Sequence, residues 1–140
     1  MKRDGFLGEG GLVSVLGISA LGILLFLSAT IYAVGASHTK AAGRFLAASA
    51  LRNAAEDGVR LGLAKMNTET GTAARAEGAA FQHVSLFAGS SGDARFNVYA
   101  RKKDEKLLLL SVSQKGAERA RVVGVVKKTG GRYVIDHWER

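Results

Sequence analysis

The segment LVSVLGISALGILLFLSATIYAV, from Leu12 to Val34, contains no charged residue. As an α-helix its 23 residues would measure about 34 Å, slightly more than the hydrocarbon core of a bilayer. Its serine and threonine hydroxyls can hydrogen-bond back to the helix, so they cost little in lipid. The sequence therefore predicts a transmembrane helix over residues 12–36, preceded by a short segment of residues 1–11.

A cleavable signal peptide is the alternative interpretation of this region. Lys2 and Arg3 would form its charged start and Val34-Gly35-Ala36 its cleavage site, which would leave Ser37 as the first residue of a secreted domain. The apolar run is much longer than the 7–15 residues usual for a signal peptide, so a membrane helix is favoured. Basic residues flank the run on both sides, and charge alone does not fix its orientation.

Helical character continues beyond the apolar run, over residues 37–66. This stretch has no proline and is rich in good helix formers. Apolar residues recur every three or four positions and form one narrow stripe, whereas Glu56 is expected to face solvent. The stripe consists of Phe45, Ala48, Leu51, Ala55, Val59, Leu63 and Met66. We expect one helix of about 50 residues whose second half is amphipathic.

The rest of the chain divides at about residue 93. Residues 67–92 are rich in small and polar residues and predict a loop, with one short helix or strand around Ala79–Phe87. Residues 93–140 contain four β-rich runs separated by polar turns, which predicts an antiparallel meander. One face of such a sheet can cover the amphipathic part of the helix. The expected fold class is therefore α+β, a long amino-terminal helix packed against a small antiparallel sheet.

Three segments of the chain carry a family resemblance. They are Glu9-Gly10-Gly11-Leu12-Val13 at the start of the apolar run, Ala54-Ala55-Glu56-Asp57-Gly58-Val59 in the amphipathic helix, and LLLLSVSQKGAERARVVGVVKK near the carboxyl terminus. Together with the order of the predicted elements, these segments resemble type IV pilin-like proteins, in particular minor pilins of the PilX type and pseudopilins. The proline and carboxyl-terminal cysteines found in many major pilins are missing here, which favours a minor subunit.

The resemblance implies a structural subunit of a type IV pilus or a type II secretion-like filament. Such a subunit crosses the cytoplasmic membrane once, with its carboxyl-terminal domain outside the cytoplasm, before it enters the filament. Its implied partners are other pilin or pseudopilin subunits, the inner-membrane assembly platform and a prepilin peptidase. The peptidase would cut at Gly5-Phe6 or at Gly10-Gly11. Glu9 would pair with a neighbour's terminal amine, or else lie among the lipid headgroups.

Catalytic and metal-binding chemistry finds little support in the sequence. There is no cysteine, and His38, His83 and His137 show no metal-ligand spacing. No nucleophile motif accompanies the Asp136-His137 pair and Ser113. We therefore expect neither an enzyme nor a bound cofactor.

The positive charge is concentrated in the predicted sheet. Residues 95–140 contain 12 Lys and Arg against 5 Asp and Glu, whereas the whole chain has 20 against 12. If aromatic residues such as Phe96, Tyr99, Tyr133 and Trp138 shared a face with these cations, the sheet could bind DNA. The alternative function is therefore a membrane-anchored module that contacts DNA or anionic lipid. The predicted patch is Arg101, Lys102, Lys103, Lys106, Arg119, Arg121, Lys127 and Lys128.

Overall fold

The computed structural model describes residues 9–79 and 82–139 and divides into two compact units, Met1–Arg44 and Phe45–Arg140. Helix α1 runs from Glu9 to Thr68 and contributes to both units. Its 60 residues exceed the predicted 50, because the helix begins before the apolar run and ends two residues after Met66.

In the first unit, α1 presents apolar side chains to its surroundings. Every large apolar side chain described between Val13 and Val34 is exposed, from 50% at Leu27 to 80% at Tyr32. The hydroxyls of Ser19, Ser28 and Thr30 donate hydrogen bonds of 2.8 to 2.9 Å to backbone carbonyls one turn earlier. The helix is long and apolar enough to cross a membrane.

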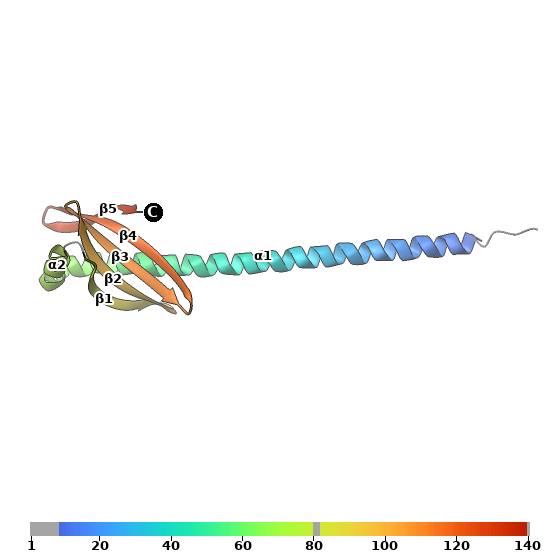
Figure 1. The fold of residues 1–140 in the computed structure, drawn as a ribbon, viewed down its shortest axis with the longest axis horizontal. Helices are drawn as coiled ribbons and strands as arrows, with labels where there is room; N and C mark the ends of the chain where they lie inside the picture. The colour runs from blue at the N-terminus through green and yellow to red at the C-terminus, as the bar shows by residue number, and fades with distance from the viewer. Residues whose placement is uncertain (1–8, 80–81, 140) are drawn as a thin grey trace, which may run out of the picture. The chain divides into compact units, whose positions relative to one another are not determined.

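The second unit contains one five-stranded antiparallel sheet in which each strand pairs with the next along the chain (Figure 1). Tight turns join the last four strands, and Gly116, Gly130 and Gly131 in these turns have positive φ. The strands are β1 (Val84–Ser91), β2 (Ala94–Lys103), β3 (Lys106–Lys115), β4 (Glu118–Thr129) and β5 (Arg132–Glu139). The predicted α+β fold, a long helix packed on a small antiparallel sheet, is confirmed.

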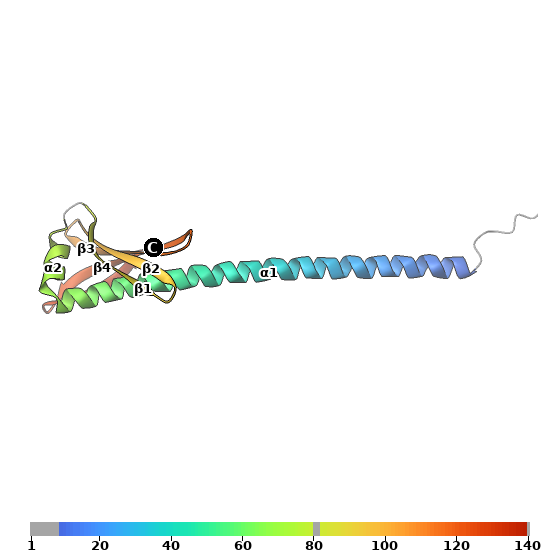
Figure 2. The same cartoon turned by 90° about the horizontal axis from the view of Figure 1, so that it is seen from below.

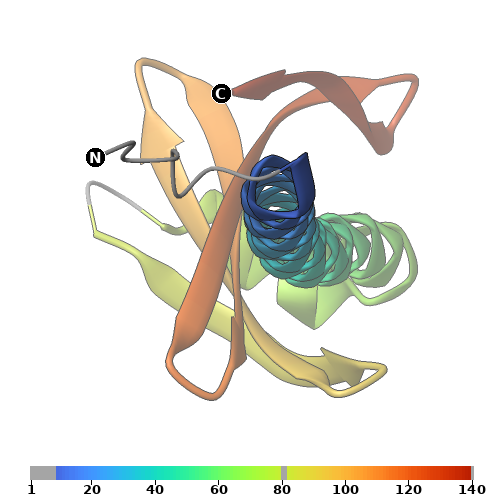
Figure 3. The same ribbon diagram turned by 90° about the vertical axis from the view of Figure 1, so that its right-hand side faces the viewer.

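The core of the second unit lies between the sheet and the carboxyl-terminal part of α1, around which the strands curve (Figure 3). Ala55, Val59 and Met66 supply the helical side of this core. The sheet supplies alternate residues of each strand, because side chains along a strand point to opposite faces. The principal sheet residues of the core are Phe96, Val98, Ala100, Leu107, Leu109, Val122 and Val126.

The small residues of the segment 54–59 let the helix approach the sheet closely. Ala54, Ala55, Gly58 and Val59 are all buried. A Cβ atom on Gly58 would overlap Ser111 Oγ and lie only 2.8 Å from a ring carbon of Phe96. This part of α1 therefore fits its neighbours only because position 58 has no side chain.

The expectation that the sheet covers the whole apolar stripe is wrong at the amino-terminal end of the stripe. Phe45 is 74% exposed and Ala48 is also exposed, whereas Leu51 is buried. The sheet covers the helix only from about Leu51 onward. One end of the sheet lies there, and Ala94 and Ala120 at this end pack with Leu51 and Ala54.

The interpretation of residues 67–92 as mainly a loop is wrong, although the short helix or strand expected around Ala79–Phe87 overlaps the observed β1. Helix α2 (Thr70–Glu77) and strand β1 occupy most of this region, and α2 packs on β1 and β2 (Figure 2). Gly71 at the start of α2 and the many small residues of β1 gave these elements weak sequence signals. Tertiary contacts stabilise β1, since Leu86 is buried and the ring of Phe87 meets that of Phe96 edge to face.

Candidate functional site

The two faces of the sheet have different chemistry. We call the face against α1 the inner face and the opposite one the outer face. Cross-strand partners share a face, so the register of β2, β3 and β4 assigns each residue to one of them. The buried residues of the inner face are apolar except for Ser111 and Ser113.

Six of the eight predicted basic residues lie on the outer face, and Arg95, which the predicted patch did not include, lies with them. Alternation along β2 could have placed Arg95 there, because it is six residues from Arg101. Lys102 and Lys128 lie on the inner side of the sheet, so the structure does not bring them together with the others. The outer-face cations are Arg95, Arg101, Lys103, Lys106, Arg119, Arg121 and Lys127.

The predicted association of aromatic residues with these cations is wrong for three of the four aromatics. Phe96, Tyr133 and Trp138 lie on the inner face and pack in or against the core. Only Tyr99 lies on the outer face, where it is half-buried. Burial of the large rings against the helix is favourable, so they lie on the inner face, whereas the cations lie on the outer face.

The outer face contains a hollow of about 140 Å³, and its apolar lining residues are Leu108, Leu110 and Val123. The guanidinium nitrogen Nε of Arg101 is buried at this face and has no hydrogen-bond partner among the residues that the structure describes. The charged and polar residues that line the hollow are His83, Arg101, Lys103, Arg121 and Glu139.

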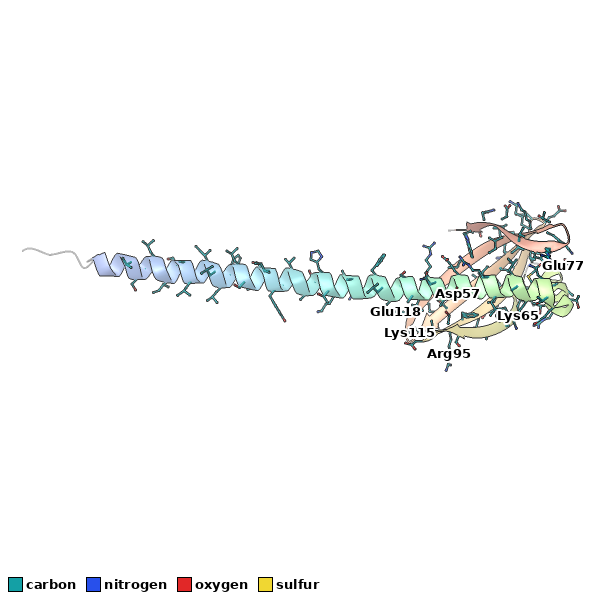
Figure 4. The ribbon with its side chains drawn as sticks, turned by 180° about the vertical axis from the view of Figure 1, so that it is seen from behind. Asp57, Lys65, Glu77, Arg95, Lys115 and Glu118 are labelled. Atoms are coloured by element: carbon teal, nitrogen blue, oxygen red, sulfur yellow. The ribbon has the colours of Figure 1, made fainter. Side chains whose placement is uncertain are left out.

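A second charged cluster joins α2 to the sheet, at the end of the sheet opposite to Lys115 and Glu118 (Figure 4). The Tyr133 hydroxyl donates a hydrogen bond to the Glu77 carboxylate, and Lys128 Nζ lies 3.2 Å from the same carboxylate oxygen. Lys128 Nζ also lies 5.1 Å from the centre of the Tyr133 ring. No local sequence pattern predicts this cluster, because Glu77 is 56 residues from Tyr133.

The contacts in this cluster shift the pKa of each member. The hydrogen bond from Tyr133 and the contacts with Lys128 lower the pKa of Glu77. The hydrogen bond to Glu77 raises the pKa of Lys128. Burial, and then the hydrogen bond to Glu77, raise the pKa of Tyr133. The cluster lines a pocket of about 540 Å³.

A smaller cluster surrounds Asp136, which occupies the β-bulge of β5. Lys127 Nζ lies 2.6 Å from one carboxylate oxygen of Asp136 and His137 Nδ1 lies 2.9 Å from the other. The hydrogen bond from Lys127, followed by that of His137, lowers the pKa of Asp136. In the part of the chain that the structure describes, no three His, Asp or Glu side chains lie close enough together to hold a metal ion.

The residues of the predicted peptidase junctions can be placed only in part. Gly5 and Phe6 lie outside the described residues, and so does the side chain of Glu9, although the backbone of α1 includes Glu9, Gly10 and Gly11. Glu56, which was expected to face solvent, is half-buried, and its carboxylate lies 3.2 Å from Nε of Arg52 on the same helix.

The chain was compared with protein-family models, with curated proteins and with solved structures. None of these comparisons gave a match.

Proposed function

We propose that this protein is a pilin-like subunit, a minor pilin or pseudopilin of a type IV pilus or a type II secretion-like filament. The observation that carries the proposal is the division of one helix into two chemically different parts. Between Val13 and Val34 the described apolar side chains of α1 are exposed, and from Leu51 onward one stripe of α1 is buried under a sheet. The first part needs lipid or other apolar helices around it, and the second part already has its partner.

The two parts fit the two environments of a filament subunit. In the membrane, the apolar part of α1 would be surrounded by lipid, with its hydroxyls bonded to the helix backbone. In a filament, the same surface would pack against the corresponding helices of neighbouring subunits, where Gly17 and Gly22 leave room for close approach. The folded sheet domain would then lie outside the cytoplasm, and the role of the chain would be structural rather than catalytic.

The test is the mature amino terminus, determined by mass spectrometry on protein from its native host and from a strain that lacks the prepilin peptidase. We expect the chain to start at Phe6 or Gly11 in the first strain and to be uncut in the second. A start at Ser37 in both strains would indicate a secreted domain, and an uncut start in both would indicate a permanent membrane anchor. Either of these two results would overturn the proposal.

A further inference from the structure

The outer face of the sheet carries an excess of positive charge that the described residues do not neutralise. Of its seven cations, only Lys127 forms an ion pair with a carboxylate in the part of the chain that the structure describes. Asp136 and Glu139 are the acidic residues on the strands of this face. The repulsion among the remaining six cations would be relieved by an anionic partner.

The hollow on this face has the properties of a site for one anionic group. Arg101, Lys103 and Arg121 line it, and the buried Nε of Arg101 lacks an acceptor among the described residues. The planar guanidinium group of an arginine presents a fork of N–H donors that matches two oxygens of a phosphate. Glu139 also lines the hollow, but its carboxylate forms no ion pair with the arginines among the described residues.

The cations occupy most of the length of the sheet and are not confined to the hollow. Arg95 and Lys103 lie eight positions apart on β2, which corresponds to about 26 Å along a strand. Arg119 lies near the first end, and Lys106 pairs with Lys103 at the second. A single headgroup-sized anion cannot reach both ends, whereas an elongated polyanion can.

We propose that the outer face binds the phosphate backbone of duplex DNA without reading its sequence. One phosphate would occupy the hollow between Arg101 and Arg121, and neighbouring phosphates would contact the cations toward either end of the sheet. A stacking platform for single strands needs several exposed aromatic rings, and among the described residues Tyr99 is the aromatic on this face. A lipid-binding face would present apolar side chains for insertion, whereas the apolar residues in the middle of this face are buried or half-buried.

The test uses the full-length protein in nanodiscs of zwitterionic phosphatidylcholine and measures the fluorescence anisotropy of two labelled 30-base-pair duplexes of unrelated sequence. We expect equal affinity for both duplexes and a steep loss of affinity between 50 and 200 mM salt. With four to six phosphate contacts, the slope of log affinity against log salt should be about −4 to −5. No binding at 50 mM salt, or binding to only one of the sequences, would overturn the proposal.

A pair of double variants tests the location of the site. Arg101→Gln with Arg121→Gln should weaken binding at least tenfold and reduce the magnitude of the slope by about 2, because each removed contact changes it by about 0.9. The control, Lys40→Gln with Arg60→Gln, removes the same charge from exposed positions of α1 and should change affinity less than twofold. Equal losses in the two double variants would show that net charge alone drives binding, and would contradict the proposed site.

Two further measurements keep the test independent of the folding of the variants. In the unaltered protein, the guanidinium NMR signals of Arg101 should shift once DNA is bound, and unchanged signals would contradict a contact between this side chain and a phosphate. Vesicles of anionic phosphatidylglycerol, added at equal phosphate concentration, should not displace the DNA. Displacement that also requires Arg101 and Arg121 would identify anionic lipid as the ligand and overturn the assignment to DNA.

Discussion

Tyr133 connects three elements of the second unit through a small number of contacts. Its backbone N–H and carbonyl both bond to the side-chain amide of Asn67, at 2.7 and 2.9 Å, which attaches β5 to the end of α1. Its hydroxyl bonds to Glu77 on α2, and Lys128 of β4 lies over its ring. The lowered pKa of Glu77 means that folding favours the ionised carboxylate.

This arrangement predicts acid-sensitive stability at the scale of one residue. The contribution of Glu77 to the stability of the folded state is complete above its ordinary pKa of 4.5. It is lost as the pH falls through the lowered pKa that Glu77 has in the folded state. We expect Glu77→Gln to melt below the unaltered protein at pH 7, and the difference between the two melting temperatures to narrow as the pH falls below 4.5. The measurement is thermal unfolding of the full-length proteins in detergent between pH 2.5 and 8. A difference between the two melting temperatures that stays constant across this pH range would show that Glu77 does not act through its charge.

At the scale of elements, the close contact between α1 and the sheet depends on glycine residues. Gly58 and Gly62 face the sheet, where a Cβ at Gly62 would lie 3.2 Å from Val98 Cγ1. On the opposite side of the contact, a Cβ at Gly124 would lie 2.9 Å from Val59 Cγ1. The packing is tight at these points, so an added Cβ requires the side chains that it meets, or the helix itself, to shift.

We therefore expect Gly58→Ala to destabilise the second unit by about 1–3 kcal/mol, even though alanine favours a helix over glycine by about 1 kcal/mol. Urea unfolding in detergent, followed by the fluorescence of Trp138, measures this difference. The matched control is Gly43→Ala on the same helix, where a Cβ would meet nothing within 4 Å. The control should be neutral or slightly stabilising, and equal stability of the two variants would contradict the close contact at Gly58.

At the scale of the whole molecule, charge is distributed unevenly along the chain. The segment from Leu12 to Val34 has no charge, whereas residues 95–140 contain 12 of the 20 basic residues. One unit is thus suited to lipid or to other apolar helices, and the other to water and to anions.

The membrane assignment predicts a strong effect of charge that depends on depth. Ile23→Lys places a charge at the middle of the apolar segment and should cost about 3–4 kcal/mol of insertion free energy. We expect this variant to be lost from the carbonate-resistant membrane fraction in the native host. Val34→Lys should remain in that fraction, because a lysine at the end of the segment can extend to the headgroups. Identical fractionation of both variants and the unaltered protein would show that this segment is not the membrane anchor.

The local pattern of the sequence predicted the elements best where the pattern is strong. The charge-free run predicted the helix of the first unit, and alternation in Arg95–Lys102 predicted β2 and the faces of Phe96, Val98 and Ala100. The runs Leu107–Leu110 and Val122–Val126 predicted strands but not faces, since both are apolar at successive positions. Val123 and Val125 lie on the outer face and are nevertheless buried, which alternation alone does not indicate.

By itself, the sequence determined that the chain is helical through Met66, that the runs after residue 93 are extended and that the segment from Leu12 to Val34 is apolar enough for a membrane, because these properties depend on residues close together in the chain. Only the tertiary structure decided that β1 forms from small residues, that Phe45 lies beyond the cover of the sheet and that Glu77 meets Tyr133. It also decided that the cations and most aromatic rings take opposite faces of the sheet. The physical reason is that these features depend on register and burial, which arise only when residues far apart in sequence compete for the same core.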